Sequence, residues 1–182
     1  MAIESPAHQL SWPATAGHPG EDTRAPMKVR QMSPGSPALA GDDNDGIVRI
    51  ARSWIGTPYV HQASAKGAGC DCLGLLRGVF RELIGTEPET PPPYSPDWAE
   101  ATGAETLYSA MLRHLTEIGP AALAPGDIAL FRMAARGPAK HCGIVASKNG
   151  ALTVIHSRQI KRVSEEVLTP FWRRKLAFAF RI

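Results

Sequence analysis

The chain of 182 residues has three cysteines, too few for the disulfide framework that stabilises small secreted domains. It has no apolar run of transmembrane length, so we expect neither a membrane-spanning helix nor a membrane partner. The first twenty residues lack a basic segment followed by an apolar one, which predicts synthesis in the cytoplasm without a secretory signal. A net charge of +3 is too small to indicate a nucleic acid partner.

Residues 1–44 are rich in proline, alanine, glycine and serine and contain few aliphatic side chains. Such a segment buries too little apolar surface to offset the entropy lost on ordering, so we expect a disordered leader. The folded part is predicted to span 45–182, which is long enough for one domain with its own core.

Helical periodicity dominates the first half of this domain. Apolar residues recur at intervals of three and four, and capping signals bound the segments, so we predict helices over 47–55, 72–84 and 102–119. Residues 87–97 contain too many prolines for a helix or a central strand, so we expect an extended surface segment there.

The apolar period then changes to two, which is typical of strands. Five strands are predicted, over 127–132, 141–147, 151–156, about 160–163 and 176–182. Helices followed by an antiparallel sheet indicate an α+β fold.

The run GAGCDCLGLLRGVF, 67–80, contains two of the cysteines, and Cys72 is the better candidate nucleophile. Cys72 begins the apolar stripe of its helix, and Asp71 before it is a good N-cap. A thiol in the first helical turn meets the positive end of the helix dipole and unpaired N–H groups, which lower its pKa from ~8.5 toward ~7 or below. Cys70 precedes the cap and has no such advantage.

A thiolate nucleophile needs a histidine base and a polar group that orients it. His141 and His156 lie in strands that flank an Asn-Gly pair at 149–150, the strongest short hairpin signal. With that pair as the turn, His156 lies opposite Gly143, which leaves room for its ring. His141 is then diagonal to it on the same face, ~7–8 Å away at the backbone. Cys142 points to the other face as a small core residue.

A thiol at a helix start and two histidines on one sheet face can assemble the site of a papain-like cysteine peptidase. Backbone N–H groups at the helix start would form the oxyanion hole. The expected fold is therefore papain-like, with N-terminal helices that carry the nucleophile at a helix start and pack on an antiparallel sheet.

Several segments also resemble, in order and spacing, the NlpC family of papain-like cell-wall peptidases. The resemblance spans roughly 46–182. The matching segments are GTPY (56–59), DCLGLL (71–76), PGDIALF (125–131), HCGIV (141–145) and IHS (155–157).

This resemblance implies that Cys72 is the nucleophile, His141 the base and His156 the residue that orients the base. It implies that Tyr59 and Asp71 line the pocket for the amino end of a peptidoglycan stem peptide. The bond such enzymes typically cut lies between D-glutamate and the diamino acid, and no cofactor is expected.

The runs 58–75 and 91–98 look closer to the branch encoded among the tail genes of phages and gene transfer agents. That likeness implies tail proteins as partners and a virion or tail location, from which the enzyme would act on the periplasmic cell wall. The chain departs from the family pattern at Leu73, where many relatives have serine, and at 61–62, where His-Gln replaces a frequent Trp-Gly. Cys70 is additional, and these departures bear on substrate detail.

Three alternatives stay open. An inactive tail component would keep the fold, and an acyltransferase or amidase would use the same three residues on another substrate. A structural zinc site is less favoured, because C-x-C followed by H-C lacks the usual ligand spacing, and we expect no metal. Its ligands would come from Cys70, Cys72, His141, Cys142 and His156.

Overall fold

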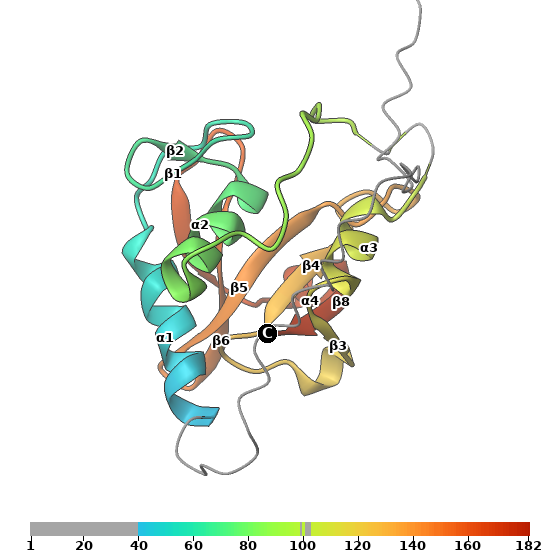
Figure 1. The fold of residues 1–182 in the computed structure, drawn as a ribbon. Helices are drawn as coiled ribbons and strands as arrows, with labels where there is room; N and C mark the ends of the chain where they lie inside the picture. The colour runs from blue at the N-terminus through green and yellow to red at the C-terminus, as the bar shows by residue number, and fades with distance from the viewer. Residues whose placement is uncertain (1–39, 99, 101–102) are drawn as a thin grey trace, which may run out of the picture.

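The computed structural model describes residues 40–98, 100 and 103–182, drawn as a ribbon in Figure 1. Helix α1 spans Ala40–Ser53, so the described chain begins as a helix within the last residues of the predicted leader. The rest of that leader lies outside the described residues. Among the described residues, no helix is long and apolar enough to cross a membrane.

The centre of the fold is a six-stranded sheet in the order β3-β8-β4-β5-β6-β7, in which all neighbouring strands are antiparallel. This sheet and the helices before it confirm the predicted α+β class. The strands are β3 (Thr116–Ile118), β4 (Ile128–Phe131), β5 (His141–Lys148), β6 (Ala151–Ser157), β7 (Val163–Val167) and β8 (Leu176–Arg181).

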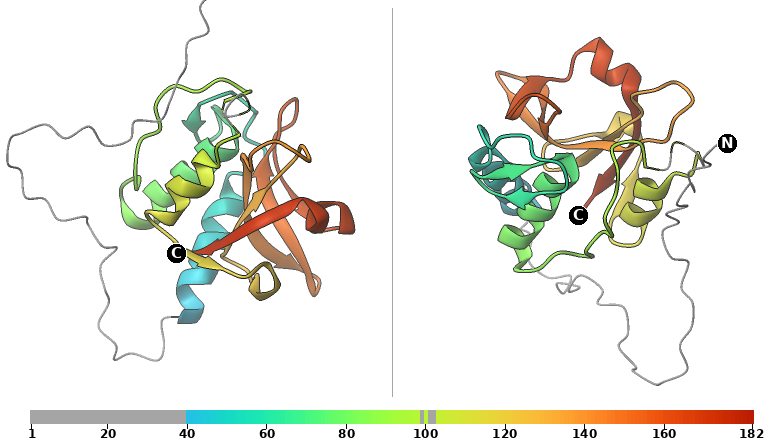
Figure 2. Two further views of the ribbon diagram at one scale, coloured as in Figure 1. Left: turned by 90° about the vertical axis from the view of Figure 1, so that its right-hand side faces the viewer. Right: turned by 90° about the horizontal axis from the view of Figure 1, so that it is seen from above.

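Helices cover both faces of the sheet (Figure 2). Helices α1, α2 (Cys72–Ile84) and α3 (Thr106–Leu112) lie on one face, over a core that includes Trp54, Leu75 and Ile144. The short helix α4 (Pro170–Lys175) lies on the other face, where Trp172 packs on a second apolar cluster that includes Phe131.

Helix α2 has a defined cap at each end. Asp71 accepts a hydrogen bond from Gly74 N at the start, and Gly85 ends the helix in the left-handed region at φ 82° with its N–H bonded to Arg81 O. A two-stranded hairpin of β1 (Ser64–Ala65) and β2 (Gly69–Cys70) leads directly into the helix. The hairpin and the cap together fix where Cys72 begins α2.

The β5–β6 hairpin has the predicted register. Lys148 pairs with Ala151, and the two turn residues Asn149 and Gly150 have φ of 52° and 77°, as a type I′ turn requires. A Cβ atom at Gly143 would lie 3.1 Å from His156 Cβ and 2.5 Å from a Val154 methyl group. Gly143 therefore leaves the space that His156 needs, as the sequence predicted.

The third predicted helix is too long. Within the described residues 103–119, only Thr106–Leu112 forms the helix α3, and β3 follows it. Thr102 of the predicted cap lies outside the described residues. Glu105 makes no side-chain capping hydrogen bond to another described residue. Its carboxylate instead accepts from Ala139 N at 2.9 Å and pairs with Arg132 at 2.5 Å.

The strand predicted at about 160–163 is wrong, because β7 begins only at Val163. The preceding residues form a turn, in which Lys161 N donates to Arg158 O at 3.0 Å and Ile160 has φ 67°. The sequence did not predict strands β1, β2 and β3 or helix α4, all of which are short.

Candidate active site

Cys72 is the first residue of α2, and its side chain is half-buried beside the start of β5. Its Sγ lies 3.8 Å from the backbone carbonyl oxygen of Lys140. Helix α2 and strand β5 pack against each other, so the start of the helix and the start of the strand meet at one place in the fold.

The pKa of Cys72 is held well below its ordinary value. The main cause is the Cys142 thiol, which donates a hydrogen bond to the Cys72 sulfur, followed by the hydrogen bond and charge of His141; burial acts in the opposite direction. The pKa of Cys142 is correspondingly raised well above its ordinary value by Cys72 and by burial. The helix start and the neighbouring His141 both favour the ionised form of Cys72.

His141 and His156 form a direct hydrogen-bonded pair, with His141 Nε2 3.0 Å from His156 Nδ1. Because His141 uses Nε2 for this bond, its Nδ1 is the nitrogen left to meet the Cys72 thiol. The structure therefore brings together the three residues that the sequence singled out, in the order thiol, histidine, histidine.

His156 is completely buried, and burial is the first cause that lowers its pKa, to about 3, with His141, Arg158 and Lys161 adding to the effect. Trp172 packs on both histidine rings, at centroid distances of 5.8 Å from His141 and 4.9 Å from His156. His156 is thus a neutral partner for His141 at neutral pH.

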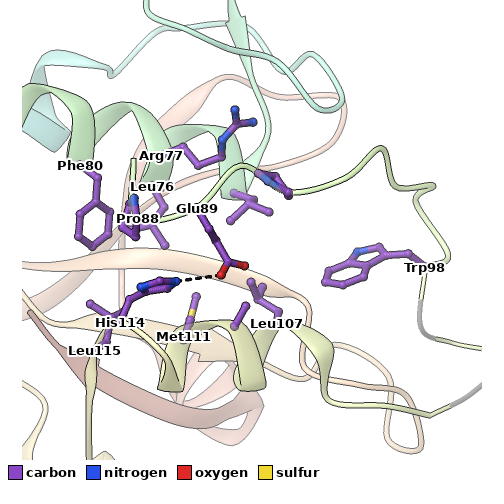
Figure 3. A pocket seen from close by; sticks show the side chains of 13 residues that line it. Leu76, Arg77, Phe80, Pro88, Glu89, Trp98, Leu107, Met111, His114 and Leu115 are labelled. Atoms are coloured by element: carbon purple, nitrogen blue, oxygen red, sulfur yellow. Dashed lines mark hydrogen bonds and ion pairs between the residues drawn. The ribbon is translucent and has the colours of Figure 1, made fainter. Parts of the chain in front are cut away.

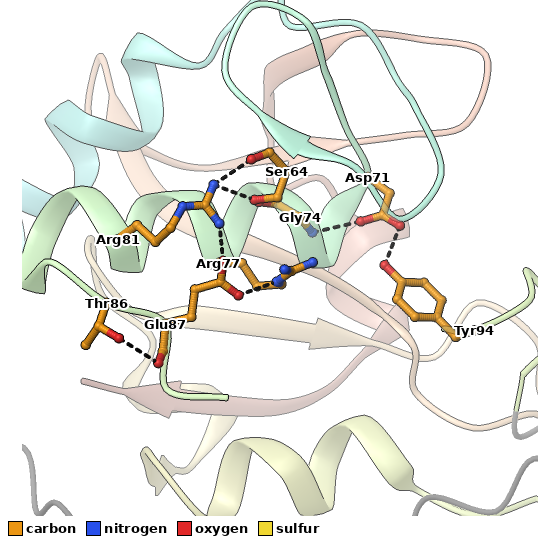
Figure 4. Close-up of polar contacts among 8 residues, drawn as sticks. All are labelled: Ser64, Asp71, Gly74, Arg77, Arg81, Thr86, Glu87 and Tyr94. Carbon is orange, nitrogen blue, oxygen red and sulfur yellow. Dashed lines mark hydrogen bonds and ion pairs between the residues drawn. The ribbon is translucent and has the colours of Figure 1, made fainter. Parts of the chain in front are cut away.

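Asp71 is 3% exposed, and both of its carboxylate oxygens accept hydrogen bonds (Figure 4). Oδ1 accepts from Gly74 N at 2.7 Å, while Oδ2 accepts from Gln62 N at 2.7 Å and from the Tyr94 hydroxyl at 2.5 Å. Burial first, and then the charge of Cys72, raise the pKa of Asp71, against the effect of these hydrogen bonds. Asp71 therefore caps α2 and also joins it to two other segments.

Tyr59 lies beside β2, in a bridge with Cys70, and its side chain is half-buried. Burial, then the charge of Asp71 and that of Cys72, raise the pKa of Tyr59. It also lines a hollow with residues of β7 and of the turn before it, including Ser164 and Glu166. The Tyr59 ring is thus close to the charged groups of the candidate site.

Cys70 is fully buried, and burial raises its pKa to about 11. The backbone carbonyl of Cys70 accepts a hydrogen bond from the Ser157 hydroxyl at 2.8 Å. A thiol with this pKa stays protonated near neutral pH, so Cys70 contributes packing at this position.

Sequence reasoning missed two partners of the site. Tyr94 lies in the proline-rich segment, which runs extended as expected but crosses the start of α2 so that its hydroxyl reaches Asp71. Cys142 lies in the core with Ile144, as predicted, but α2 covers the same face and brings Cys72 to it. The lone tyrosine in PPPYSPDW was the one available signal for the first contact.

His61 and Gln62, which replace the Trp-Gly pair frequent in the family, also lie beside Asp71. His61 Nδ1 lies 3.6 Å from Asp71 Oδ2, and His61 Nε2 lies 2.8 Å from the backbone oxygen of Tyr94. Gln62 donates to that same Tyr94 oxygen at 2.6 Å. Both side chains therefore hold the Tyr94 segment against the start of α2.

An apolar cavity of about 70 Å³ lies next to the site, between α2, the proline-rich segment and α3 (Figure 3). Leu73, Phe80, Trp98 and Met111 are among its lining residues, and His114 bonds Glu89 at 2.8 Å across one side. Among the described residues, no three histidine, cysteine, aspartate or glutamate side chains are grouped so as to hold a metal ion.

Comparisons with known proteins find relatives of this chain. The profile of the NlpC/P60 family matches residues 56–181. The gamma-DL-glutamyl hydrolase of Bacillus subtilis strain 168 is 28% identical over 131 residues, which cover 71% of this chain. The chain spans only 27% of that relative's length.

Solved structures share the fold. The NlpC/p60 domain of the peptidoglycan hydrolase SagA aligns with a TM-score of 0.54 and 24% identity, over 76% of this chain and 98% of that one. The peptidoglycan hydrolase RipB of Mycobacterium tuberculosis aligns with a TM-score of 0.52 and 20% identity, over 81% and 68% of the two chains. These likenesses confirm the predicted papain-like arrangement of helices on an antiparallel sheet.

Proposed function

The chain belongs to the NlpC/P60 family, and from that premise we propose that it is a cysteine peptidase that hydrolyses peptidoglycan stem peptides. The observation that carries this proposal is the low-pKa thiol of Cys72, at a helix start, beside the hydrogen-bonded pair of His141 and His156. A thiolate next to a histidine whose far nitrogen is held is the arrangement that nucleophilic acyl transfer requires.

The reaction follows from these positions. The Cys72 thiolate attacks the scissile carbonyl carbon, and the carbonyl electrons move to oxygen. Gly74 N–H is used by Asp71, so the oxyanion would be bound by the earlier N–H groups of α2, those of Cys72 and Leu73. The protonated His141 gives its proton to the leaving amine, and a thioester remains on Cys72.

Water then completes the cycle. Neutral His141 takes a proton from water as the water attacks the thioester, and the peptide acid leaves as the Cys72 thiolate is restored. His156 accepts the Nε2–H of His141 throughout, which keeps the other ring nitrogen, Nδ1, toward the thiol.

We assign substrate binding to Tyr59 and Asp71, which lie beside Cys72. We also propose that the bond cleaved is the one between D-glutamate and the diamino acid. The name of the Bacillus subtilis relative, a gamma-DL-glutamyl hydrolase, supports this choice of bond. A set of synthetic stem peptides, each with one cleavable bond, tests it by mass spectrometry of the products. Cleavage at the D-glutamyl bond is expected, and cleavage only at another bond would contradict the assignment.

We also propose that the enzyme is carried on a phage-like tail and reaches the periplasmic wall with the particle. The support is the likeness of 58–75 and 91–98 to the branch encoded among tail genes. Purified particles should contain the protein in an immunoblot. Finding it in the periplasm of cells that make no particles would refute this location.

A further inference from the structure

His156 has one ring nitrogen whose partner the catalytic scheme does not supply. Within the described residues, His156 Nε2 and Ser164 Oγ are the buried side-chain polar atoms that have no hydrogen-bond partner. The two residues face each other across the β6–β7 pair. A buried N–H or hydroxyl without a partner destabilises a fold, so this pair calls for an explanation.

The Glu166 carboxylate lies close to that nitrogen, with Oε2 3.8 Å from His156 Nε2. Glu166 is on β7, two residues beyond Ser164, so its side chain points to the same face of the sheet as His156. Its Oε2 is held 3.2 Å from the Arg158 guanidinium, and its Oε1 lies 3.9 Å from Lys161 Nζ. The carboxylate is therefore kept in place beside the buried ring.

The reaction needs one tautomer of His156. For His141 to receive the thiol proton on Nδ1 it must carry hydrogen on Nε2, and that hydrogen must point to a lone pair on His156 Nδ1. The single hydrogen of neutral His156 then lies on Nε2. In the other tautomer His156 donates to His141 Nε2, so His141 cannot become an imidazolium without breaking their bond.

We propose that Glu166 is a positioning residue that selects the productive tautomer of His156 by accepting its Nε2–H, with the Ser164 hydroxyl beside it. This inference rests on the proposed function, because the productive tautomer is defined by the peptidase reaction. In this role Glu166 acts through His156 and His141.

The surroundings of His156 favour this role. The titratable groups that face it are His141 on β5, Arg158 and Lys161 after β6, and Glu166 on β7, while Trp172 of α4 packs edge-on against its ring. The two cations oppose protonation of the ring, and the Arg158 guanidinium also lies 5.6 Å from the centroid of Trp172. A neutral histidine beside an anchored carboxylate has its hydrogen on the nitrogen that faces the carboxylate.

The test reads the His156 tautomer directly, by ¹H–¹⁵N NMR of the imidazole nitrogens at neutral pH. The wild-type protein is expected to show hydrogen on Nε2, and Glu166→Ala should show the Nδ1–H tautomer as a substantial second population. Glu166→Gln keeps the shape and one acceptor oxygen, so it should show a smaller shift in the same direction. An unchanged tautomer in both variants would overturn the proposal.

A second readout follows the consequence at the thiol. Alkylation of Cys72 by iodoacetamide at pH 7 should slow at least about threefold in Glu166→Ala, because fewer molecules hold the thiolate–imidazolium pair. Glu165→Gln is the matched control. Glu165 is the neighbouring residue on β7, but it points to the other face of the sheet and bonds Arg52 at 2.8 Å. In Glu165→Gln, Cys72 should therefore be alkylated at the wild-type rate.

Activity separates this inference from the proposed function. On a stem peptide, Glu166→Ala should lose kcat about tenfold with KM unchanged, as expected for a group that acts only by orienting another. If the wild-type protein cleaves no stem peptide but the Glu166 variants show the expected tautomer shift, the proposed function is overturned and the tautomer assignment is left intact. An equal fall in Glu165→Gln would overturn the role of Glu166.

Discussion

At the scale of single residues, the site depends on which groups are already occupied. Asp71 is the clearest case, because its buried carboxylate accepts from Gly74 N, Gln62 N and the Tyr94 hydroxyl. A substrate ammonium that approaches Asp71 must compete with the tyrosine for Oδ2. The helix cap was predictable from the sequence, since aspartate before an apolar stripe is a standard cap. The contact with Tyr94, more than twenty positions away, was not.

The competition at Asp71 leads to a prediction for Tyr94→Phe. Phenylalanine keeps the ring contacts with His61 and Trp98 but removes the hydroxyl, which frees a lone pair on Asp71. We expect KM for a stem peptide with a free amino terminus to fall roughly three- to tenfold, the range expected when one hydrogen bond to a charged group becomes available. The same peptide with an acetylated amino terminus is the control. A fall of equal size for both peptides would contradict the account.

His156 should make the stability of the protein depend on pH. Its pKa is about 3 in the folded protein and about 6.5 in an unfolded chain, so between these values the unfolded chain binds a proton that the folded one does not. Stability from this group is therefore complete above pH 6.5 and is lost as the pH falls toward 3. Between pH 7.5 and 5 we expect a loss of about 2 kcal/mol.

Urea unfolding at several pH values measures this effect. The His156→Gln variant removes the group that titrates, so its free energy of unfolding should fall less than that of the wild type over the same interval. Parallel curves for the two proteins would show that His156 is not held neutral in the folded state.

At the scale of elements, the site is placed by two close contacts that glycine permits. Gly78 of α2 packs on the ring of Trp54, just after α1, where an added Cβ would lie 2.1 Å from a ring carbon. An added Cβ at Gly74 would lie 1.8 Å from the backbone oxygen of Ala63. Helix α2 is therefore pressed between α1 and the β1 hairpin, which fixes the position of its first residue.

We predict that Gly78→Ala destabilises the protein by about 1–3 kcal/mol, because the Trp54 ring or the helix axis must move. The matched control is Gly46→Ala in α1, where an added Cβ would meet nothing within 4 Å. That change should stabilise the protein by about 0.5–1 kcal/mol through helix propensity. Thermal unfolding of the two variants measures both effects, and equal melting temperatures would contradict the packing described here.

The elements also show where sequence reasoning succeeds. Helix α2 and the β5–β6 hairpin follow from local patterns: an apolar stripe with a cap, and an Asn-Gly turn that fixes the register. Strands β1, β2 and β3 and helix α4 have six residues or fewer, so they contain too few periods to show a pattern. Their positions come from tertiary contacts, such as the packing of Trp172 against the two histidines.

At the scale of the whole molecule, the sheet separates two apolar clusters, and the candidate site lies where its strands meet the start of α2. The thiol is on the side of α1 and α2, whereas Trp172 packs on the histidine rings from the side of α4. His141 joins the two sides because it is the first residue of β5. Strand parity correctly predicted that the two histidines share a face and that Cys142 points to the other one. It could not predict that Cys72 contacts Cys142, because that contact depends on where α2 packs on the sheet.

The role of Cys72 as the nucleophile is best tested by digestion of purified muropeptides. The wild-type protein, Cys72→Ala and Cys70→Ala would be incubated with the same substrate and the products identified by mass spectrometry. We predict that the wild type and Cys70→Ala cleave one stem-peptide bond and that Cys72→Ala loses this cleavage at least about a thousandfold. Cleavage that survives in Cys72→Ala, or is lost in Cys70→Ala while that variant stays folded, would contradict the assignment of the nucleophile.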